Sequence, residues 1–206
     1  MQHQWLSRRG TDSLILLFGG WALGASAFAG MGSDADALLV HDYRDLDDPL
    51  PEVGQYDHVD LVAFSFGVAS AVHWMSAVAF LPERLVAISG TLSPADVDRG
   101  IAPEMIRATA DSLSDDGFAR FCRRAGLAGP APAIDIVAAR AELHAVIDRG
   151  PAPDHPIDRI WIPGHDRIIP TQAQETAWKS QEHSIRRCPG SHIPFGPEQN
   201  WAEWIR

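Results

Sequence analysis

One short stretch constrains the fold of this chain more than any other: an apolar run that ends at a serine. The run Val59–Phe64 is apolar at all but one position and has the length of a buried strand. Ser65 follows it, and Gly67 then opens the helical pattern 68–80. Ala63 and Gly67 stand two residues to either side of the serine, where larger side chains would collide in a tight turn. The stretch therefore predicts a serine on a sharp corner between a strand and a helix.

Two later segments contain the partners that a serine nucleophile requires. A serine hydroxyl is a weak nucleophile at neutral pH, so it needs a base, and the base needs an acidic partner. Asp166 follows the strand-like run 159–162, and His192 lies in a loop after the last short strand. The order Ser65, Asp166, His192 is that of enzymes with the α/β-hydrolase fold, whose nucleophile elbow has the pattern small-x-Ser-x-Gly. We therefore predict that these three side chains form a catalytic triad.

Each of the three residues also has a simpler explanation. Ser65 could close a strand as an ordinary small residue, and Asp166 could cap the helix that begins near Thr171. The chain has nine histidines, and His183 is the main alternative to His192 as the base, although it falls inside a strand-like run. His165 is expected to pack or to face water, with a place in the lining of the site as the alternative. His73 is expected to be a core histidine with satisfied hydrogen bonds and not a ligand.

A glycine pair near the N-terminus is expected to complete the site. The apolar run Leu14–Phe18 predicts a buried strand, and Gly19–Trp21 follows it. Glycine lets the backbone approach a substrate closely. We expect the backbone N–H groups of Trp21 and Phe66 to hold the oxyanion of an acyl-transfer intermediate. The ring of Trp21 would form a wall of the acyl pocket.

The order of the segments predicts an α/β fold with a doubly wound, mostly parallel sheet. We expect strands at residues 12–18, 37–41, 59–64, 85–89, 159–162 and 184–187, and helices at 68–80, 171–179 and 197–205. Residues 93–156 are predicted to form a helical cap, inserted into a hydrolase core of residues 1–92 and 157–206. The sheet is expected to be reduced, because no β-hairpin precedes the strand at Leu14.

Composition and charge exclude several classes of protein. Hydrophobic residues make up 46% of the 206 residues, enough for the core of a single domain. No apolar run could span a bilayer, the first residues lack a signal-peptide pattern, and the two cysteines do not have a disulfide-scaffold spacing, so we expect a cytoplasmic protein. No metal-binding motif is present, and we expect no cofactor. A net charge of −10 argues against binding to nucleic acid or to an anionic membrane.

A further set of motifs runs over almost the whole chain. They are Phe18–Trp21, Asp42–Leu46, Ala63–Val68, Ile88–Thr91, Gly100–Pro103, Asp166–Pro170, Trp178 and His192–Phe195. Together they resemble the BioG-type pimeloyl-acyl-carrier-protein methyl ester esterases of biotin synthesis. The elbow of that family is usually A-W-S-M-G, so Phe64 and Phe66 depart from its pattern. The resemblance implies hydrolysis of the methyl ester on a pimeloyl chain carried by acyl carrier protein, which frees the distal carboxylate.

Recognition of a carrier protein poses a charge problem, because carrier proteins are acidic and this chain carries a net charge of −10. Arginines suit the phosphate and the carboxylates of such a partner. Five arginines of the predicted cap could form a local basic patch: Arg107, Arg120, Arg123, Arg124 and Arg140. Three of them have the i, i+3, i+4 spacing of one helical face. The simpler alternative is a solvated face, paired with Asp115, Asp116 and Glu142.

Other functions are compatible with the same residues. A serine esterase or thioesterase for other short acyl chains would share the triad and differ in the pocket and the cap. A binding module with the hydrolase fold would need a displaced His192 or a blocked pocket, and a lyase could reuse the triad. Activity on p-nitrophenyl esters distinguishes an esterase from the binding module.

Overall fold

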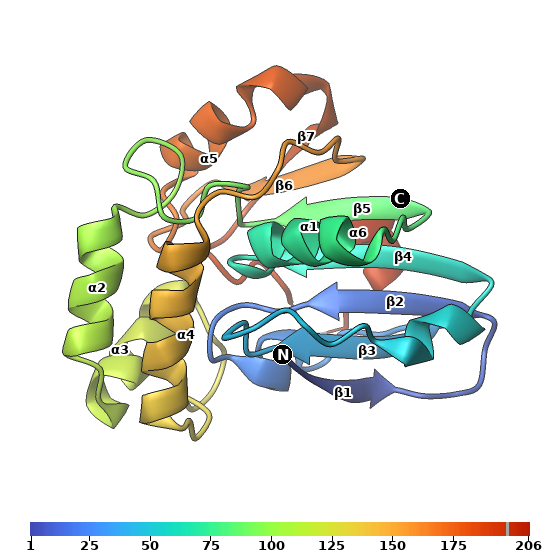
Figure 1. Ribbon diagram of the computed structural model, residues 1–206, viewed down its shortest axis with the longest axis horizontal. Coiled ribbons are helices and arrows are strands. Elements are labelled where there is room, and N and C mark those ends of the chain that lie inside the picture. Colours follow the sequence, from blue (N-terminus) through green and yellow to red (C-terminus); the bar gives the residue numbers. More distant parts are fainter. Residues whose placement is uncertain (197) are drawn as a thin grey trace.

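The computed structural model describes residues 1–196 and 198–206, and a mostly parallel sheet forms its centre (Figure 1). Its strands are β1 (Gln2–Ser7), β2 (Ser13–Phe18), β3 (Asp36–His41), β4 (His58–Phe64), β5 (Arg84–Ile88), β6 (Arg159–Pro163) and β7 (Ile185–Cys188). They lie in the order β1-β3-β2-β4-β5-β6-β7. Neighbouring strands are parallel except for β1 and β3, which are antiparallel. The predicted α/β fold with a doubly wound sheet is confirmed.

The strand that the sequence does not predict is β1, at the edge of the sheet. Its sequence, Gln-His-Gln-Trp-Leu-Ser, is mostly polar, because an edge strand keeps much of its surface in water. The apolar run that marks the other strands is therefore missing. Since β1 pairs with β3 and not with β2, no β-hairpin precedes β2, as expected.

The path of the chain brings the turns after β2 and β4 together. From β2 the chain continues to β3 on one side of it, and then crosses to β4 on its other side. Such a reversal opens a crevice at the carboxyl ends of the strands, where open α/β sheets bind their ligands. Trp21 follows β2 and Ser65 follows β4, so both predicted site residues lie at this crevice.

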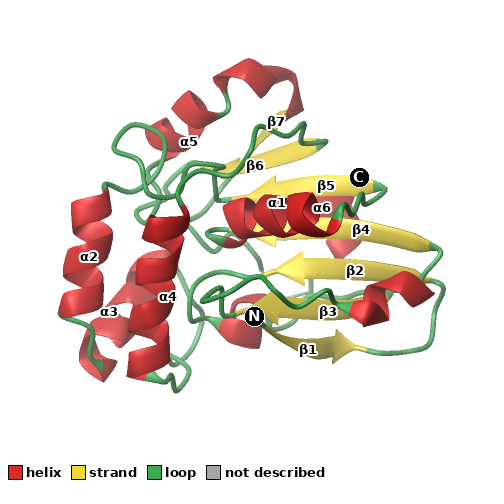
Figure 2. Ribbon diagram, in the orientation of Figure 1, coloured by secondary structure: helices red, strands yellow, loops and turns green. Residues whose placement is uncertain are grey.

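Alternate side chains of the strands are buried on opposite faces of the sheet. On one face, strand residues such as Leu16 and Leu61 share a cluster with α1 (Gly67–Val78). On the other face, Leu17 and Val62 share a cluster with α6 (Trp201–Ile205). Figure 2 shows these two helices in red on either side of the yellow strands. Full burial of one such side chain contributes about 1.5–3 kcal/mol to folding.

Three helices lie between β5 and β6 in the chain: α2 (Pro103–Asp111), α3 (Asp115–Ala125) and α4 (Ile136–Arg149). In space they lie at the carboxyl ends of the parallel strands (Figure 1). Ser114 and Asp135 accept N–H groups at the starts of α3 and α4, and Gly126 ends α3 with φ of 91°. The predicted insertion is thus helical, while its separation as a cap at residues 93–156 stays a prediction.

The C-terminal region differs from expectation in its boundaries. The predicted helix 171–179 is α5 (Thr171–Ala177), followed by a 3₁₀ helix, Lys179–Ser184, that contains His183. The strand-like assignment of His183 is wrong, because this polar segment has no β-branched residue and β7 begins only at Ile185. The last helix begins at Trp201, and the predicted start at Pro197 lies outside the described residues. In the part of the chain that the structure describes, every helix is too short or too polar to cross a membrane.

Candidate active site

Ser65 occupies the corner between β4 and α1. Its φ is 57°, in the left-handed region that a serine rarely adopts, and its N–H donates to the carbonyl of Ile88 at 2.9 Å. The turn depends on Gly67, because a Cβ there would lie 2.3 Å from the carbonyl oxygen of Phe18. The positive φ of Ser65 costs on the order of 1–3 kcal/mol, and such strained residues are concentrated at functional sites.

The side chain of Ser65 lies beside His192, which in turn lies beside Asp166. Nε2 of His192 is 2.9 Å from Oγ of Ser65, and Nδ1 is 2.8 Å from Oδ2 of Asp166. In the tautomer that donates Nδ1–H to Asp166, Nε2 can accept the serine proton. All three side chains are buried, and they come from the loops after β4, β6 and β7. The fold thus brings the three predicted residues together, and their catalytic role stays a prediction.

Asp166 is held by hydrogen bonds that the sequence does not reveal. Its Oδ1 accepts the N–H groups of Ile168 and Ile169 at 2.8 and 3.0 Å. Its Oδ2 also accepts Nε2–H of Gln174 at 2.8 Å. Gln174 lies on α5 and is fully buried, and only its place on a predicted helix near Asp166 could have drawn attention to it. The alternative role of Asp166 as a helix cap is wrong, because Pro170 is the N-cap of α5.

The backbone N–H groups of Trp21 and Phe66 lie on the two turns that meet at the crevice. Within residues 1–196 and 198–206, neither N–H donates a hydrogen bond to another protein group. A Cβ at Gly20 would lie 2.8 Å from the ring of Phe64 and 3.3 Å from Cβ of Ser65, so this glycine lets the Trp21 turn approach the serine. Two N–H groups beside a nucleophile suit an oxyanion, and this role stays a prediction.

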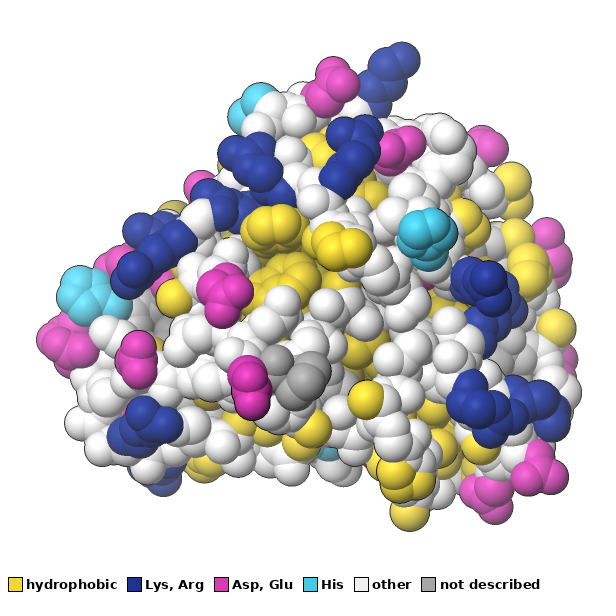
Figure 3. All heavy atoms as spheres, turned by 180° about the vertical axis from the view of Figure 1, so that it is seen from behind, with side chains coloured by type: hydrophobic (Ala, Val, Ile, Leu, Met, Phe, Trp, Pro, Cys, Tyr) yellow, Lys and Arg dark blue, Asp and Glu magenta, His cyan; other side chains and the backbone are white. Residues whose placement is uncertain are grey.

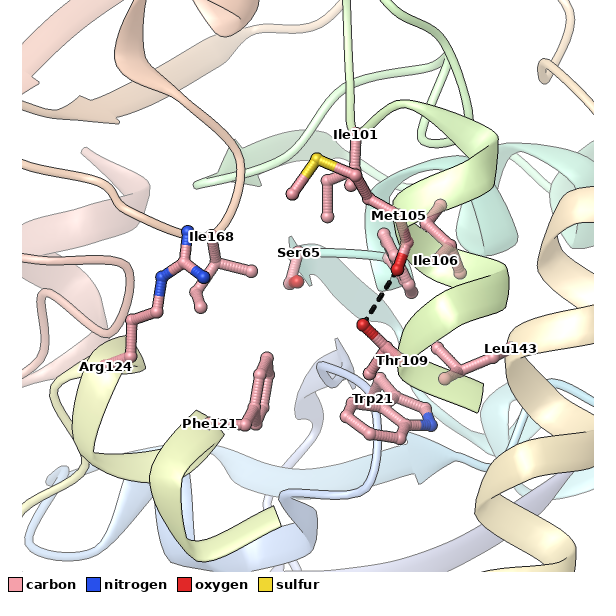
Figure 4. Close-up of a pocket in the computed structure, with 11 residues that line it drawn as sticks. Trp21, Ser65, Ile101, Met105, Ile106, Thr109, Phe121, Arg124, Leu143 and Ile168 are labelled. Carbon is pink, nitrogen blue, oxygen red and sulfur yellow. Dashed lines mark hydrogen bonds between the residues drawn. The ribbon is translucent and has the colours of Figure 1, made fainter. Parts of the chain in front are cut away.

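A pocket opens over Ser65, with a total volume of about 560 Å³ including its open mouth (Figure 4). The side chains around Ser65 are mostly apolar: Trp21, Phe66, Ile101, Met105, Ile106, Thr109, Phe121, Arg124, Leu143 and Ile168. The hydroxyl of Thr109 donates to the carbonyl of Met105 in its own helix at 2.9 Å, as the dashed line in Figure 4 shows. These walls suit an acyl chain.

The aromatic residues near Ser65 have different surroundings. Trp21 lines the pocket and contacts the ring of Phe121 edge-on, with centroids 5.0 Å apart. Phe66 also lines the pocket, whereas Phe64 is buried under the site, 5.1 Å from the imidazole of His192. Of the two departures from the family pattern, only Phe66 is therefore placed to contact a substrate.

The five arginines of the predicted patch do not share one environment. Arg120, Arg123 and Arg124 are exposed on α3, and Figure 3 shows Lys and Arg side chains on the right of the molecule, where α2 and α3 lie in that view. Arg124 also reaches the pocket of Ser65 (Figure 4). Arg107 is exposed on α2, whereas Arg140 is half-buried and donates to a carbonyl of α2 at 2.8 Å.

The simpler alternative for these arginines is a solvated face paired with Asp115, Asp116 and Glu142. The exposure of Arg120, Arg123 and Arg124 fits the solvated part of this alternative. Among the described residues, none of the five arginines forms a salt bridge. Glu142 is buried on α4, and its carboxylate accepts the N–H of Tyr43. The arginines of α3 therefore lie on a solvent-exposed face.

The remaining candidate histidines lie apart from the hydrogen-bonded trio. His183 and His165 are exposed, and Nε2 of His73 is 3.4 Å from the carbonyl of Gly150. Burial lowers the pKa of His73. In the ranges that the structure describes, no three His, Cys, Asp or Glu side chains are grouped so as to hold a metal ion.

The buried carboxylate of Glu142 lies outside the pocket. Oε1 of Glu142, on α4, accepts the N–H of Tyr43 at 3.1 Å. The side chain is almost fully buried, and this burial is the main reason why the pKa of Glu142 rises from 4.5 to about 7. Glu142 therefore links the stability of the fold to pH.

We expect Glu142→Gln to stabilise the fold at alkaline pH and to have little effect at acidic pH. The pKa of Glu142 is about 7 in the folded protein and 4.5 in the unfolded chain. The neutral carboxyl therefore stabilises the fold fully below pH 4.5, and this stabilisation is lost as the pH rises through about 7. The shift corresponds to a free-energy difference on the order of 3 kcal/mol. Thermal unfolding of both proteins at about pH 5 and about pH 8 should show a gap in Tm that widens with pH. A difference in Tm that is the same at both pH values would contradict the raised pKa of Glu142.

Comparison with known sequences finds a family and a relative named for acyl carrier protein, and a second relative that is uncharacterized. A family model described as "Pimeloyl-ACP methyl esterase BioG" matches residues 1–204. The chain is 29% identical over 191 residues to a malonyl-[acyl-carrier protein] O-methyltransferase of Bacteroides fragilis, and the match covers 86% of this chain but only 39% of that protein. It is 26% identical over 208 residues to an uncharacterized protein of Haemophilus influenzae, with 93% of each covered.

Solved structures share the fold. The crystal structure of BioG from Haemophilus influenzae matches with a TM-score of 0.86, 24% identity and full coverage of both chains. The RedJ thioesterase of Streptomyces coelicolor matches with a TM-score of 0.60 and 16% identity, over 92% of this chain and 87% of that one. Carboxylesterase CesB of Bacillus subtilis matches with a TM-score of 0.53 and 14% identity, over 93% and 80% of the two chains. At these identities the likeness establishes the α/β-hydrolase fold.

Proposed function

Because the chain belongs to the family of pimeloyl-ACP methyl esterase BioG, we propose that it hydrolyses the methyl ester of a pimeloyl chain carried by acyl carrier protein. The products would be pimeloyl-acyl-carrier protein and methanol. The observation that carries this proposal is the hydrogen-bonded series Ser65, His192 and Asp166 beside an apolar pocket. This series contains a nucleophile, a base and an acid in contact.

The first step forms an acyl-enzyme. Oγ of Ser65 attacks the ester carbonyl while Nε2 of His192 takes its proton, and Asp166 stabilises the imidazolium through Nδ1–H. The N–H groups of Trp21 and Phe66 would hold the negative charge that develops on the carbonyl oxygen. Loss of one such donor costs ~2.7–4 kcal/mol in related chemistry, so their placement matters nearly as much as the triad.

The second step releases the acid. Methanol has already departed in the first step, in which His192 gives the serine proton to the leaving methoxide as the acyl-enzyme forms. Water then loses a proton to His192 and attacks the acyl-enzyme, and Ser65 recovers its proton as the carboxylate product leaves. The chemistry needs only the side chains and backbone groups of this chain.

The proposed carrier is consistent with the surface around the pocket. The names of the matching family and of the Bacteroides fragilis relative both contain acyl carrier protein. The exposed arginines of α3 lie next to the pocket, since Arg124 lines it and Arg120 lies one helical turn before Arg124. A phosphate-bearing arm and an acidic protein would meet positive charge there.

Charge reversal on α3 tests carrier binding. We expect Arg120→Glu/Arg123→Glu to raise KM for the carrier-linked ester, and more strongly at low salt, where unscreened charges act over a longer range. Arg124 is kept, because it lines the pocket of Ser65. Hydrolysis of a small free ester should be almost unchanged. Steady-state kinetics with both substrates at two salt concentrations measure the effect.

A matched control carries the same change in net charge elsewhere. Arg8 and Arg9 are exposed in the loop from β1 to β2, at the amino ends of the parallel strands and opposite α3. Their double replacement by Glu should leave both KM values unchanged. If the α3 variant lost the same factor in kcat/KM on the carrier-linked ester and on the small free ester, these arginines would hold the helices together. The carrier-binding proposal would then fail.

Methanol release tests the proposed reaction itself. The protein should release methanol from the methyl ester of pimeloyl-carrier protein and should also hydrolyse p-nitrophenyl esters. Hydrolysis of p-nitrophenyl esters without methanol release would favour an esterase or thioesterase for other short acyl chains. Turnover of neither substrate would favour a binding module with this fold.

A further inference from the structure

A tyrosine outside the pocket contacts the turn that carries Trp21. Tyr43 follows β3 and is fully buried, and its ring stacks on Phe18 with centroids 6.0 Å apart. Its hydroxyl lies 2.9 Å from the carbonyl oxygen of Gly19 and 3.0 Å from that of Val40. The phenol therefore holds the peptide between Gly19 and Gly20. The next peptide along the chain carries the N–H of Trp21.

The backbone of Tyr43 is in turn held by α4 at both of its polar groups. Oε1 of Glu142 accepts its N–H at 3.1 Å, and Nη2 of Arg149 donates to its carbonyl at 2.6 Å. The preceding residue, Asp42, has φ of 62°, a conformation that an aspartate keeps only when its surroundings fix it. The position of Tyr43 therefore depends on α4.

Trp21 also contacts α4 directly. Nε1–H of its indole donates to the carbonyl of Ala139 at 2.9 Å. Ala139 and Glu142 are both buried and lie three residues apart, on one side of the helix. The turn Gly19–Trp21 is thus attached to α4 at two points, one through the indole and one through Tyr43.

We propose that Tyr43 is a positioning residue, which couples the placement of α4 to the orientation of the Trp21 N–H. The inference rests on the proposed function, because it assigns that N–H to the oxyanion. A hydrogen-bond donor aimed at a developing charge acts only over a narrow range of distance and angle, so a small rotation of the turn lowers the rate of the chemical step. Substrate binding in the apolar pocket would change little.

Tyr43→Phe tests this role, because it keeps the ring and removes only the hydroxyl. We expect kcat for a small p-nitrophenyl ester to fall about tenfold, with KM within about twofold of the wild type. The affinity for a trifluoromethyl ketone, which forms a tetrahedral oxyanion on a catalytic serine, should fall by a similar factor. A residue with a merely structural role would not change this affinity in step with kcat.

Tyr56→Phe is the matched control. The hydroxyl of Tyr56 donates to Oδ2 of Asp36 at 2.8 Å, and Asp36 begins β3 at the opposite end of that strand from Tyr43. Both variants lose the hydrogen-bonding contacts of one phenol hydroxyl, so both should show a lower Tm. Only Tyr43→Phe should show a lower kcat.

A second pair of variants tests the link to α4 even if Tyr43→Phe does not fold. Glu142→Gln keeps an oxygen that can accept the Tyr43 N–H, and its kcat should equal that of the wild type. Glu142→Leu removes the acceptor, and its kcat should fall while KM stays unchanged. Wild-type kcat in both Tyr43→Phe and Glu142→Leu would overturn the inference alone. A wild type that hydrolyses no ester would overturn the proposed function, and the inference with it.

Discussion

Replacing Ser65 by alanine is expected to lower kcat for ester hydrolysis by at least about 10⁴-fold, because the variant lacks the nucleophile. The fold should persist, since the side chain of Ser65 is small and its hydroxyl bonds only to His192 among the described residues. Steady-state kinetics with a p-nitrophenyl ester measure the loss. Thermal unfolding should give a Tm close to that of the wild type.

Ser76→Ala is a control for this substitution. Ser76 lies on α1, the helix that follows the elbow, and its hydroxyl donates to the carbonyl of Val72 within that helix. Its activity should equal that of the wild type. If Ser65→Ala retained turnover within a few-fold of the wild type, Ser65 would not be the nucleophile.

The base and its acidic partner should show the second large effect. His192→Ala is expected to lose at least about 10⁴-fold in kcat, because no group is left to take the serine proton. Asp166→Asn should lose less, since Asp166 orients the imidazole and does not transfer the proton. The side-chain amide of Asn can donate to Nδ1 and so favours the unproductive tautomer. Kinetics of both variants with the same small ester measure the difference.

His183→Ala separates the two candidate bases. His183 is exposed in the 3₁₀ helix before β7, and the structure shows it apart from Ser65. This variant should keep full activity. If His183→Ala were inactive and His192→Ala were active, the catalytic base would be His183 and not His192.

The sequence predicts the fold and the members of the site for a common physical reason. Parallel strands buried on both faces appear as short apolar runs, and the residues that follow them must lie at the carboxyl edge of the sheet. Ser65 and Asp166 each follow such a run, in β4 and β6. His192 follows β7, a partly exposed edge strand with the sequence Ile-Arg-Arg-Cys. All three residues follow parallel strands of one sheet, so their meeting is a consequence of topology. The edge strand β1 is mostly polar and has no apolar run, so the sequence does not predict it.

The supports of the site leave no such local pattern. Gln174 and Asp166 are eight residues apart, but which side of α5 faces Asp166 depends on how the helix packs. The hydrogen bond between Tyr43 and Glu142 joins residues 99 positions apart, and nothing near either residue indicates the other. Buried polar groups find their partners through tertiary packing, and the sequence alone shows only that they are polar.

The intact mass of the carrier protein tests the central claim most directly. Acyl carrier protein loaded with the methyl ester of pimelate should lose the mass of one CH₂ group on incubation with the wild type, because the ester becomes an acid and the chain stays on the carrier. The same carrier should keep its mass with Ser65→Ala. Loss of the whole acyl chain, which would show cleavage of the thioester, or an unchanged mass with the wild type would contradict the account.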